Sequence, residues 1–410
     1  MVRKRLYTGL LLITLSFSMM AQDELNQYLK IAGENNPGLK ATFNKYMAAL
    51  EQAPQVSSLP DLQLAFGYFI QPVETRNGPQ EFKFSATQMF PWFGTLKAKE
   101  NASIQAAKAQ YEVFEESRSK LFSEVKSNWY NLYFNNKAIG ITLENIDILN
   151  TFKKLALVKV EAGMVSAIDQ YRIEMEINDL ENQLALLCDQ QYVLEVAFNK
   201  LLNTKEPISI LLPDELWTND YYLSKAATLD SIKLRNHQLL GIDLQKQALA
   251  FKKKAAQKMG APSFSLGIDY VAIGKGNNHL SGKDAIAFPK VGLSIPLYRH
   301  KYKSMVQEVL YLEVAKDYER ADKENVLETL FEKTWKDYSD AHRRITLYES
   351  QLALATRTLK LLETEYAYAN TNFEEVLRME RRLLKYNLEL EKAKTDKQAS
   401  IAFIDFLMGK

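Results

Sequence analysis

Four short stretches of the chain alternate between apolar and polar or small residues, with the period of two that is typical of β-strands. The alternation is clearest in Leu64-Ala65-Phe66-Gly67-Tyr68 and returns three times further along. Strands of about ten residues with one apolar face are typical of membrane β-barrels, although a small soluble sheet over a core also fits each strand taken alone. The predicted strands cover residues 61–71, 81–90, 263–273 and 286–296.

Two pairs of such strands cannot close a barrel by themselves, because a barrel filled by its own side chains needs about eight strands. An open edge facing lipid would leave backbone groups without hydrogen-bond partners in hydrocarbon. Several chains are therefore expected to share one barrel. Three copies of a four-stranded unit supply twelve strands, an even number that such barrels allow.

A very long helix is predicted after each pair of strands. Residues 94–163 contain no proline, and residues 299–369 contain neither proline nor glycine. The helices, at about 94–162 and 299–368, are each roughly 100 Å long at about 1.5 Å per residue. Ile345, Leu352 and Leu359 recur at heptad spacing, which predicts left-handed coiled-coil pairing. A simple two-stranded coiled coil remains an alternative for any isolated segment.

The order of elements repeats along the chain at an offset of about 200 residues, which indicates a duplicated unit. Pro60 and Tyr68 have counterparts in Pro262 and Tyr270. The predicted fold is mainly α with a small β part, each repeat reading helix, two strands, long helix, turn and helix. The repeats are expected at 22–206 and 222–410, with a linker at 207–221, turns at 163–169 and 369–375, and shorter helices at about 23–57, 166–203, 222–259 and 371–408.

The N-terminus has the composition of a secretory signal peptide, expected to cover residues 1–21. Arg3, Lys4 and Arg5 precede an apolar run that is shorter than the roughly 20 residues of a membrane-spanning helix. An uncleaved anchor is the alternative. Cys188 is the only cysteine, so an exported chain must be stabilised by packing or assembly instead of an internal disulfide. The mature chain is nearly neutral, which gives no reason to expect a nucleic-acid partner.

No constellation of catalytic or metal-binding residues stands out. The histidines are scattered and form no HExxH arrangement. No nucleophile, base and orienting group can be assembled from the sequence. We therefore expect a protein that is not an enzyme and that binds neither a cofactor nor a metal ion.

Several short pieces of sequence, in their order along the chain, resemble the TolC family of outer-membrane efflux proteins over essentially all of the mature chain. They are Asn36-Pro37-Gly38-Leu39, Pro60-Asp61-Leu62, Phe90-Pro91-Trp92-Phe93-Gly94, the turn from Gly163 to Asp169, and Phe406-Leu407-Met408-Gly409.

The resemblance implies a homotrimer whose twelve-stranded barrel lies in the bacterial outer membrane and continues into a long α-helical barrel in the periplasm. It implies a passive export duct that receives substrates from a periplasmic adaptor protein and an inner-membrane pump. A periplasmic coiled-coil adaptor, or a structural protein without a pore, is the alternative function. An exported enzyme stalk is a further rival, but it would need a catalytic cluster.

The resemblance also implies a gate at the periplasmic tip. Asp169 and Tyr366 lie where the family has one latch pair, and Glu375, preceded by Glu374, lies at an acidic-ring position. Two residues depart from the family pattern: Thr371 replaces a latch arginine, and Arg378 replaces a second acidic residue. Acidic residues also suit the start of any helix, which is the alternative for the glutamates. The residues expected to meet the adaptor are Gly163, Met164, Val165, Ser166, Ala369, Asn370, Thr371 and Asn372.

Overall fold

The structure is a computed structural model, and it describes residues 24–163, 166–217, 220–275, 286–368 and 373–410. The predicted signal peptide (1–21) lies outside the described residues. So do the tip residues Met164 and Val165 and the segment 369–372.

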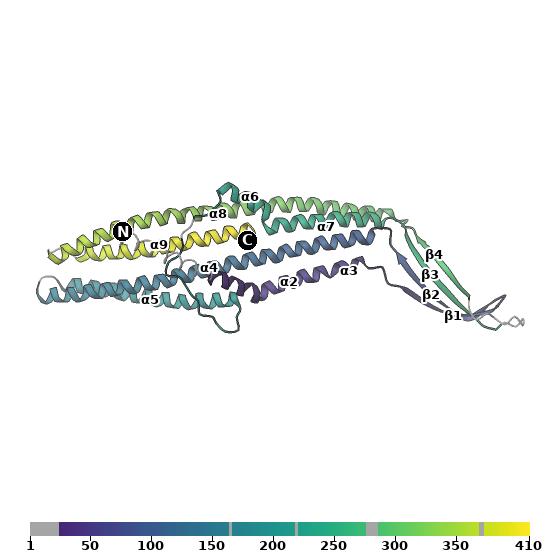
Figure 1. The fold of residues 1–410 in the computed structure, drawn as a ribbon, viewed down its shortest axis with the longest axis horizontal. Coiled ribbons are helices and arrows are strands. Elements are labelled where there is room, and N and C mark those ends of the chain that lie inside the picture. Colours follow the sequence, from purple (N-terminus) through teal and green to yellow (C-terminus); the bar gives the residue numbers. More distant parts are fainter. Residues whose placement is uncertain (1–23, 164–165, 218–219, 276–285, 369–372) are drawn as a thin grey trace, which may run out of the picture. The chain divides into compact units, whose positions relative to one another are not determined.

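A single antiparallel sheet contains all four predicted strands, in the order β1-β2-β3-β4 (Figure 1). β2 and β3 pair although they are far apart in the sequence, with Ala86 opposite Ile268. The registers place the alternating apolar positions of neighbouring strands on one face, as in the pair Phe66 and Phe84. The strands are β1 (Gln63–Thr75), β2 (Gly78–Phe90), β3 (Ser263–Ile273) and β4 (Ile286–Ser294).

The two edge strands each contain a proline. β1 runs on to Thr75, beyond the predicted end at residue 71, and includes Pro72. Its pairing with β2 shifts register between Tyr68 and Val73. Pro289 lies within β4, the opposite edge of the sheet. Proline has no N–H to donate to a neighbouring strand, so a sheet tolerates it in an edge strand, where one side of the strand is not paired.

Two helices are far longer than the elements around them. α4 runs from Thr95 to Glu161 over 67 residues, and α8 runs from Arg299 to Tyr368 over 70 residues. Each returns through a turn into a shorter helix, α5 (Ala167–Leu202) or α9 (Phe373–Leu407). These bounds lie within one or two residues of the predicted 94–162 and 299–368 for the long helices.

The helix before each pair of strands is interrupted, whereas the sequence pattern predicted continuous helices at 23–57 and 222–259. The breaks fall at Asn36 and Asn236, counterparts in the two predicted repeats. The amide of Asn36 donates to the carbonyl of Leu201 at 3.3 Å, and that of Asn236 donates to Leu407 at 2.9 Å. Each asparagine thus satisfies a carbonyl at the end of a returning helix. The segments are residues 24–35, α2 (Pro37–Leu50), α3 (Gln52–Ser57), α6 (Lys225–Arg235) and α7 (His237–Met259).

The chain divides into two compact units that do not coincide with the two predicted repeats. The first unit takes the chain up to Ala41, Glu115–Asn236 and Glu324–Lys410; the second takes Thr42–Phe114 and His237–Lys323. Each predicted repeat therefore contributes to both units, because α4 and α8 each continue from one unit into the other.

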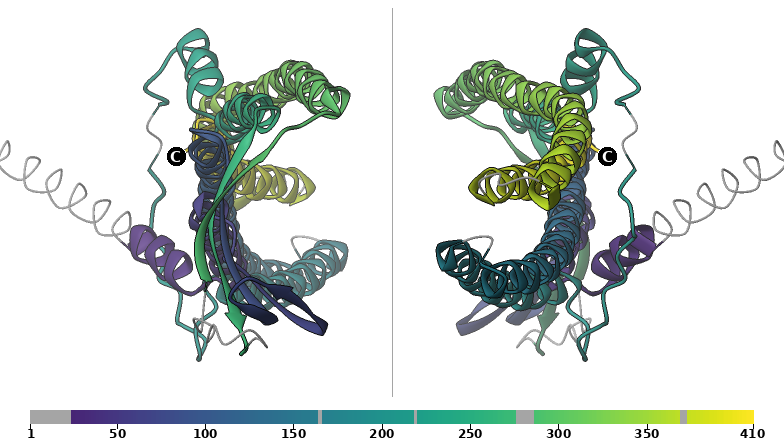
Figure 2. Two further views of the ribbon diagram at one scale, coloured as in Figure 1. Left: turned by 90° about the vertical axis from the view of Figure 1, so that its right-hand side faces the viewer. Right: turned by 90° about the vertical axis from the view of Figure 1, so that its left-hand side faces the viewer.

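In the first unit the helices pack as two pairs, α4 with α5 and α8 with α9 (Figures 1 and 2). The amide of Asn135 donates to the carbonyl of Leu187 at 2.8 Å, joining α4 to α5. Arg344 forms an ion pair with Asp396 at 2.6 Å, joining α8 to α9. Among the described residues, no helix combines the length and apolar composition needed to cross a bilayer.

Candidate functional site

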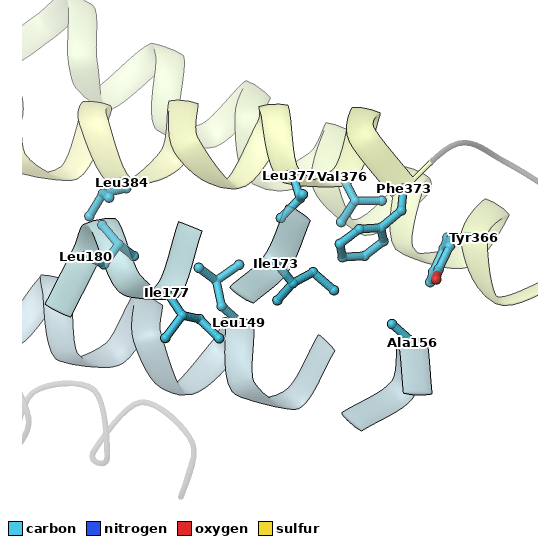
Figure 3. Packing of buried hydrophobic residues seen from close by; sticks show 10 residues of the cluster. All are labelled: Leu149, Ala156, Ile173, Ile177, Leu180, Tyr366, Phe373, Val376, Leu377 and Leu384. Carbon is cyan, nitrogen blue, oxygen red and sulfur yellow. The ribbon is translucent and has the colours of Figure 1, made fainter. Parts of the chain in front are cut away.

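A cluster of buried apolar residues joins α4, α5, α8 and α9 near the turns that end the long helices (Figure 3). Phe373, the first residue of α9, belongs to this cluster and is fully buried. Its ring lies 4.8 Å from that of Tyr366 on α8 and 5.5 Å from that of Phe152 on α4. The apolar heptad positions therefore bring the two helix pairs together beside the predicted gate. Also in the cluster are Leu149, Ala156, Ile173, Ile177, Leu180, Val376, Leu377 and Leu384.

Tyr366 of the predicted latch is buried in this cluster, with only 2% of its surface exposed. Its hydroxyl has no hydrogen-bond partner among the described residues. The ammonium group of Lys159 lies 3.9 Å from the ring centroid, and it also donates to the carbonyl of Tyr366. Burial raises the pKa of the Tyr366 phenol, and the charge of Asp169 raises it further. Asp169 is therefore near Tyr366, as a latch requires, although no hydrogen bond joins them.

Charged residues link the first turns of α5 and α9 on the outside of the cluster. Arg172 lies 3.8 Å from both Asp169 and Glu374. Arg381 lies 2.7 Å from Glu176 and 3.6 Å from Glu374. Two arginines on different helices thus share Glu374, so this carboxylate is part of an ion-pair network between α5 and α9.

The predicted acidic-ring residue, Glu375, forms an ion pair with Arg378 within α9. Arg378 is the residue that departs from the family pattern. A carboxylate paired in this way attracts a cation less strongly than a bare one, since the neighbouring guanidinium cancels much of its field. Arg172, Glu176 and Arg381 were not predicted as site residues, although i, i+3 spacing joins Arg172 to Asp169 in the sequence.

A buried carboxyl group that was not predicted from the sequence lies two turns into α9. Glu380 is 3% exposed and hydrogen-bonds with the side chain of Asn145. Burial raises the pKa of Glu380 to about 7, and the nearby charge of Glu363 contributes to the rise. Its counterpart in the first predicted repeat, Glu174, is partly exposed and pairs with Lys153 at 3.0 Å. The sequence could not distinguish these two glutamates, because the difference lies in which helix covers them.

Two of the predicted adaptor-docking residues lie within the described part of the chain. Gly163 follows α4 and has a φ of 68°, the left-handed conformation that glycine adopts readily at a helix end. Ser166 is exposed and caps α5, with its hydroxyl accepting from the N–H of Ile168 at 3.3 Å. The other six, Met164, Val165, Ala369, Asn370, Thr371 and Asn372, lie outside the described residues.

The sheet presents an extended apolar surface. On β1 the exposed fraction is 62% for Leu64, 69% for Phe66 and 70% for Tyr68. The opposite face carries Asp269, which is buried between Lys83 at 2.5 Å and Lys290 at 3.3 Å. One face thus has the apolar character of a surface that contacts lipid or another chain, whereas the other is polar and internally paired.

No group of three or more histidine, cysteine, aspartate or glutamate residues within the described ranges could hold a metal ion.

Comparisons with known proteins find similarity in structure alone. No protein-family model matches the sequence, and no curated protein is similar to it. The outer-membrane protein VceC of Vibrio cholerae is 15% identical, with a TM-score of 0.77 over 96% of this chain and 98% of VceC. A membrane protein of Pseudomonas aeruginosa is 15% identical, with a TM-score of 0.75 over 94% and 93%.

The open state of the MtrE outer-membrane channel of Neisseria gonorrhoeae is 12% identical, with a TM-score of 0.74 over 94% of this chain and 89% of MtrE. The similarity extends over nearly the whole of each protein, so it includes the sheet, the long helices and the returning helices together. The mainly α fold with a small antiparallel sheet is confirmed, and the chain has the fold of the TolC-family outer-membrane channels.

Proposed function

We propose that this chain is one subunit of a homotrimeric outer-membrane export duct, with its sheet in the membrane and its long helices in the periplasm. The duct conducts substrates passively from a periplasmic adaptor and an inner-membrane pump to the exterior. The fold shared with VceC and MtrE supports a channel of this kind.

The observation that carries the proposal is the four-stranded sheet with one exposed apolar face and two unclosed edges. β1 and β4 are the edge strands, and the apolar residues of β1 are mostly exposed. In a bilayer, every strand edge must be paired. Edge-to-edge pairing of three copies satisfies the backbone of β1 and β4 and turns the apolar face towards lipid.

The helices support assembly independently of the sheet. Leu347, Leu354 and Leu361 recur every seven residues on α8 and are 48%, 55% and 67% exposed. On α5, Ile168 and Met175 are exposed at the same spacing. Apolar heptad positions without a partner in their own chain are the seams of a coiled coil that forms between chains. Neighbouring copies provide such partners in a trimeric tube.

At the tip, Asp169 and Tyr366 form the latch, and the turns after α4 and α8 meet the adaptor. The gate differs from a bare acidic ring, because Glu374 and Glu375 each have an arginine partner. A ring of unpaired carboxylates would favour cations strongly. We expect a weaker cation preference at this entrance.

Fractionation and channel recording test the proposal together. The full-length chain, expressed in a Gram-negative host, should appear in outer-membrane fractions as a trimer that dissociates on heating in SDS. The purified trimer should produce stepwise ion currents in planar bilayers. A chain that is extracted without detergent as a monomer, and that adds no current, would instead support the periplasmic adaptor alternative.

A further inference from the structure

The first turns of α4 and α8 are basic, which is unusual for helix starts. α4 begins Thr95-Leu96-Lys97-Ala98-Lys99, and α8 begins Arg299-His300-Lys301-Tyr302-Lys303, with no acidic residue in either first turn. The start of a helix carries a partial positive charge, so acidic residues stabilise it and basic residues do not. α5 and α9 follow this preference, with Asp169 in the first and Glu374 and Glu375 in the second. Helix stability alone therefore does not explain the lysines and arginine.

Contacts within the second unit bring these helix starts together with the end of α7. The ammonium of Lys258, near the end of α7, donates to the carbonyl of Phe93 at 3.0 Å. A Cβ added to Gly260 would lie 3.3 Å from the Cβ of Tyr302. No acidic residue occurs between Asp243 and Asp269, a stretch that includes Lys254 and Lys258. It also includes Lys252 and Lys253, which pair with Glu308 and Glu313 on α8. Three segments thus place basic residues at one level, where the strands join the helices.

Most of the basic residues in the first turns of α4 and α8 have no acidic partner in the described part of the chain. Lys97 pairs with Glu100 at 2.9 Å. Lys99, Arg299, Lys301 and Lys303 have no ion pair within the part of the chain that the structure describes. We name Lys97, Lys99, Lys258, Arg299, Lys301 and Lys303 the junction belt. An anionic partner outside the chain would neutralise the excess positive charge of the junction belt.

Exposed apolar side chains lie next to the junction belt on the strand side. Phe93 is 76% exposed, Leu297 is 80% exposed and Tyr298 is 86% exposed. Trp92 stacks against Phe264, the second residue of β3, with ring centroids 5.9 Å apart. Aromatic residues that flank basic ones are typical of the level where a bilayer's hydrocarbon meets its headgroups. The exposed aromatics and the belt therefore fit one partner, a lipid surface.

We propose that the junction belt binds the phosphate groups of anionic phospholipids. This inference rests on the proposed function, in which the strands lie in the outer membrane and the helices in the periplasm. The belt then lies at the headgroups of the periplasmic leaflet. Basic side chains gain about 1 kcal/mol each from an anionic lipid surface. Phosphates also suit the N–H groups at the starts of α4 and α8, and they offset the repulsion between the lysines and the helix dipoles.

Quenching of Trp92 tests the lipid preference. The purified full-length protein is reconstituted into bilayers of phosphatidylcholine with brominated tails, which quench tryptophan, and unbrominated phosphatidylglycerol is added as a competitor. A Trp92→Phe variant gives the signal of the other tryptophans, to be subtracted. We expect phosphatidylglycerol to relieve quenching with a preference of about fivefold over unbrominated phosphatidylcholine, the factor expected for one basic residue near the surface.

Two triple variants decide whether the belt causes this preference. The first variant removes half of the belt's six basic residues and should reduce the preference clearly towards onefold; its substitutions are Arg299→Gln, Lys301→Gln and Lys303→Gln. The second variant is the control: it removes three charges from α8 in the other compact unit and should leave the phosphatidylglycerol preference unchanged. Its substitutions are Lys333→Gln, Lys336→Gln and Lys360→Gln. Normal quenching by the brominated lipid without a phosphatidylglycerol preference, or equal loss in both variants, would overturn the inference. Absence of any quenching would instead contradict the membrane location in the proposed function.

Discussion

Glu380 and Glu174 show how strongly the packing of helices changes the environment of a glutamate side chain. They are counterparts in the two predicted repeats, yet Glu174 is partly exposed and ion-paired whereas Glu380 is covered. A carboxyl group loses hydration when it is buried, and this favours its neutral form. Burial, followed by the charge of Glu363, therefore raises the pKa of Glu380 to about 7 from its ordinary value of 4.5, although the hydrogen bond with Asn145 lowers it. Protonation of this single group then links stability to pH.

The pH dependence has a definite sign. Between about pH 4.5 and 7 the folded chain retains a proton on Glu380 that the unfolded chain has lost, so stability falls as pH rises through this window. Glu380→Gln should remove the loss and raise the free energy of unfolding at pH 8 by on the order of 2 kcal/mol. Thermal unfolding followed by circular dichroism from pH 5 to 8 measures this effect. Glu174→Gln is the matched control and should retain the wild-type slope. Parallel curves for wild type and Glu380→Gln would contradict the prediction.

A second prediction at the residue scale concerns the latch. Asp169→Ala combined with Tyr366→Ala should increase single-channel conductance in planar bilayers, because α8 then loses the buried side chain that packs in one cluster with α5 at the tip. Tyr366→Phe keeps the ring that packs on Phe373 and removes only the hydroxyl, so it separates the effect of the hydroxyl from that of the ring. Unchanged conductance in the double variant would remove the latch assignment.

Some contacts at the tip could be anticipated from the sequence and others could not. Asp169, Tyr366 and Glu375 were predicted through the family resemblance, and Asp169 and Tyr366 lie close enough for the charge of one to affect the other. The partners of Glu374 were not predictable, because Arg172 lies on α5 and is far from Glu374 in sequence. Sequence spacing identifies neighbours along one helix, whereas contacts between helices depend on how the helices are rotated and aligned.

At the scale of elements, the alternating pattern of the strands specifies two unlike faces. Phe66 lies on the exposed apolar face of β1, and its neighbour Ala65 points to the other face. Phe66→Lys should cost about 2–4 kcal/mol in the bilayer and sharply reduce the heat-modifiable trimer in outer-membrane fractions. Ala65→Lys faces the polar side and should assemble normally. Equal trimer yields from the two variants would contradict the orientation of the sheet.

The apolar stripe on α8 leads to a prediction about assembly. Leu354 is 55% exposed in the single chain, so Leu354→Asp should leave the fold of each chain intact. It should weaken each contact between chains by about 2 kcal/mol, the cost of failing to bury one leucine. Light scattering of the detergent-solubilised protein should show dissociation at concentrations where wild type is trimeric. Thr356→Asp, which is exposed on the opposite side of α8 from Leu354, is the control. Equal dissociation in the two variants, or none in Leu354→Asp, would contradict this assignment.

Some ends of helices and strands could be predicted from sequence patterns, and others could not. The lengths of α4 and α8 were predictable to within one or two residues, because turn residues and strands bound them on both sides. The end of β1 was not, since Pro72 reads as the start of a loop. The proline is accommodated because β1 is an edge strand, and a single strand's sequence does not reveal its place in the sheet. The break at Asn236 was missed for a similar reason: its amide bonds to α9, far away in sequence.

For the whole molecule, the central claim is that three chains join their sheets edge to edge into one barrel. β1 and β4 are separated within a chain by β2 and β3, which corresponds to about 14 Å at about 4.7 Å per strand. That separation exceeds the Cα distance of about 7 Å beyond which a disulfide cannot form. A disulfide between these two strands must therefore join different copies. The contact is head-to-tail, so three copies either close into a ring or continue into longer chains.

Disulfide cross-linking tests the claim directly. In a Cys188→Ser background, Phe66→Cys on β1 is combined in turn with Pro289→Cys, Val291→Cys or Leu293→Cys on the same face of β4, and membranes are oxidised before denaturing electrophoresis. At least one combination should give a ladder of monomer, dimer and trimer that ends at the covalent trimer, whereas each single cysteine should give monomer alone. Monomers from every combination, or a ladder that continues beyond the trimer, would contradict a closed barrel of three chains.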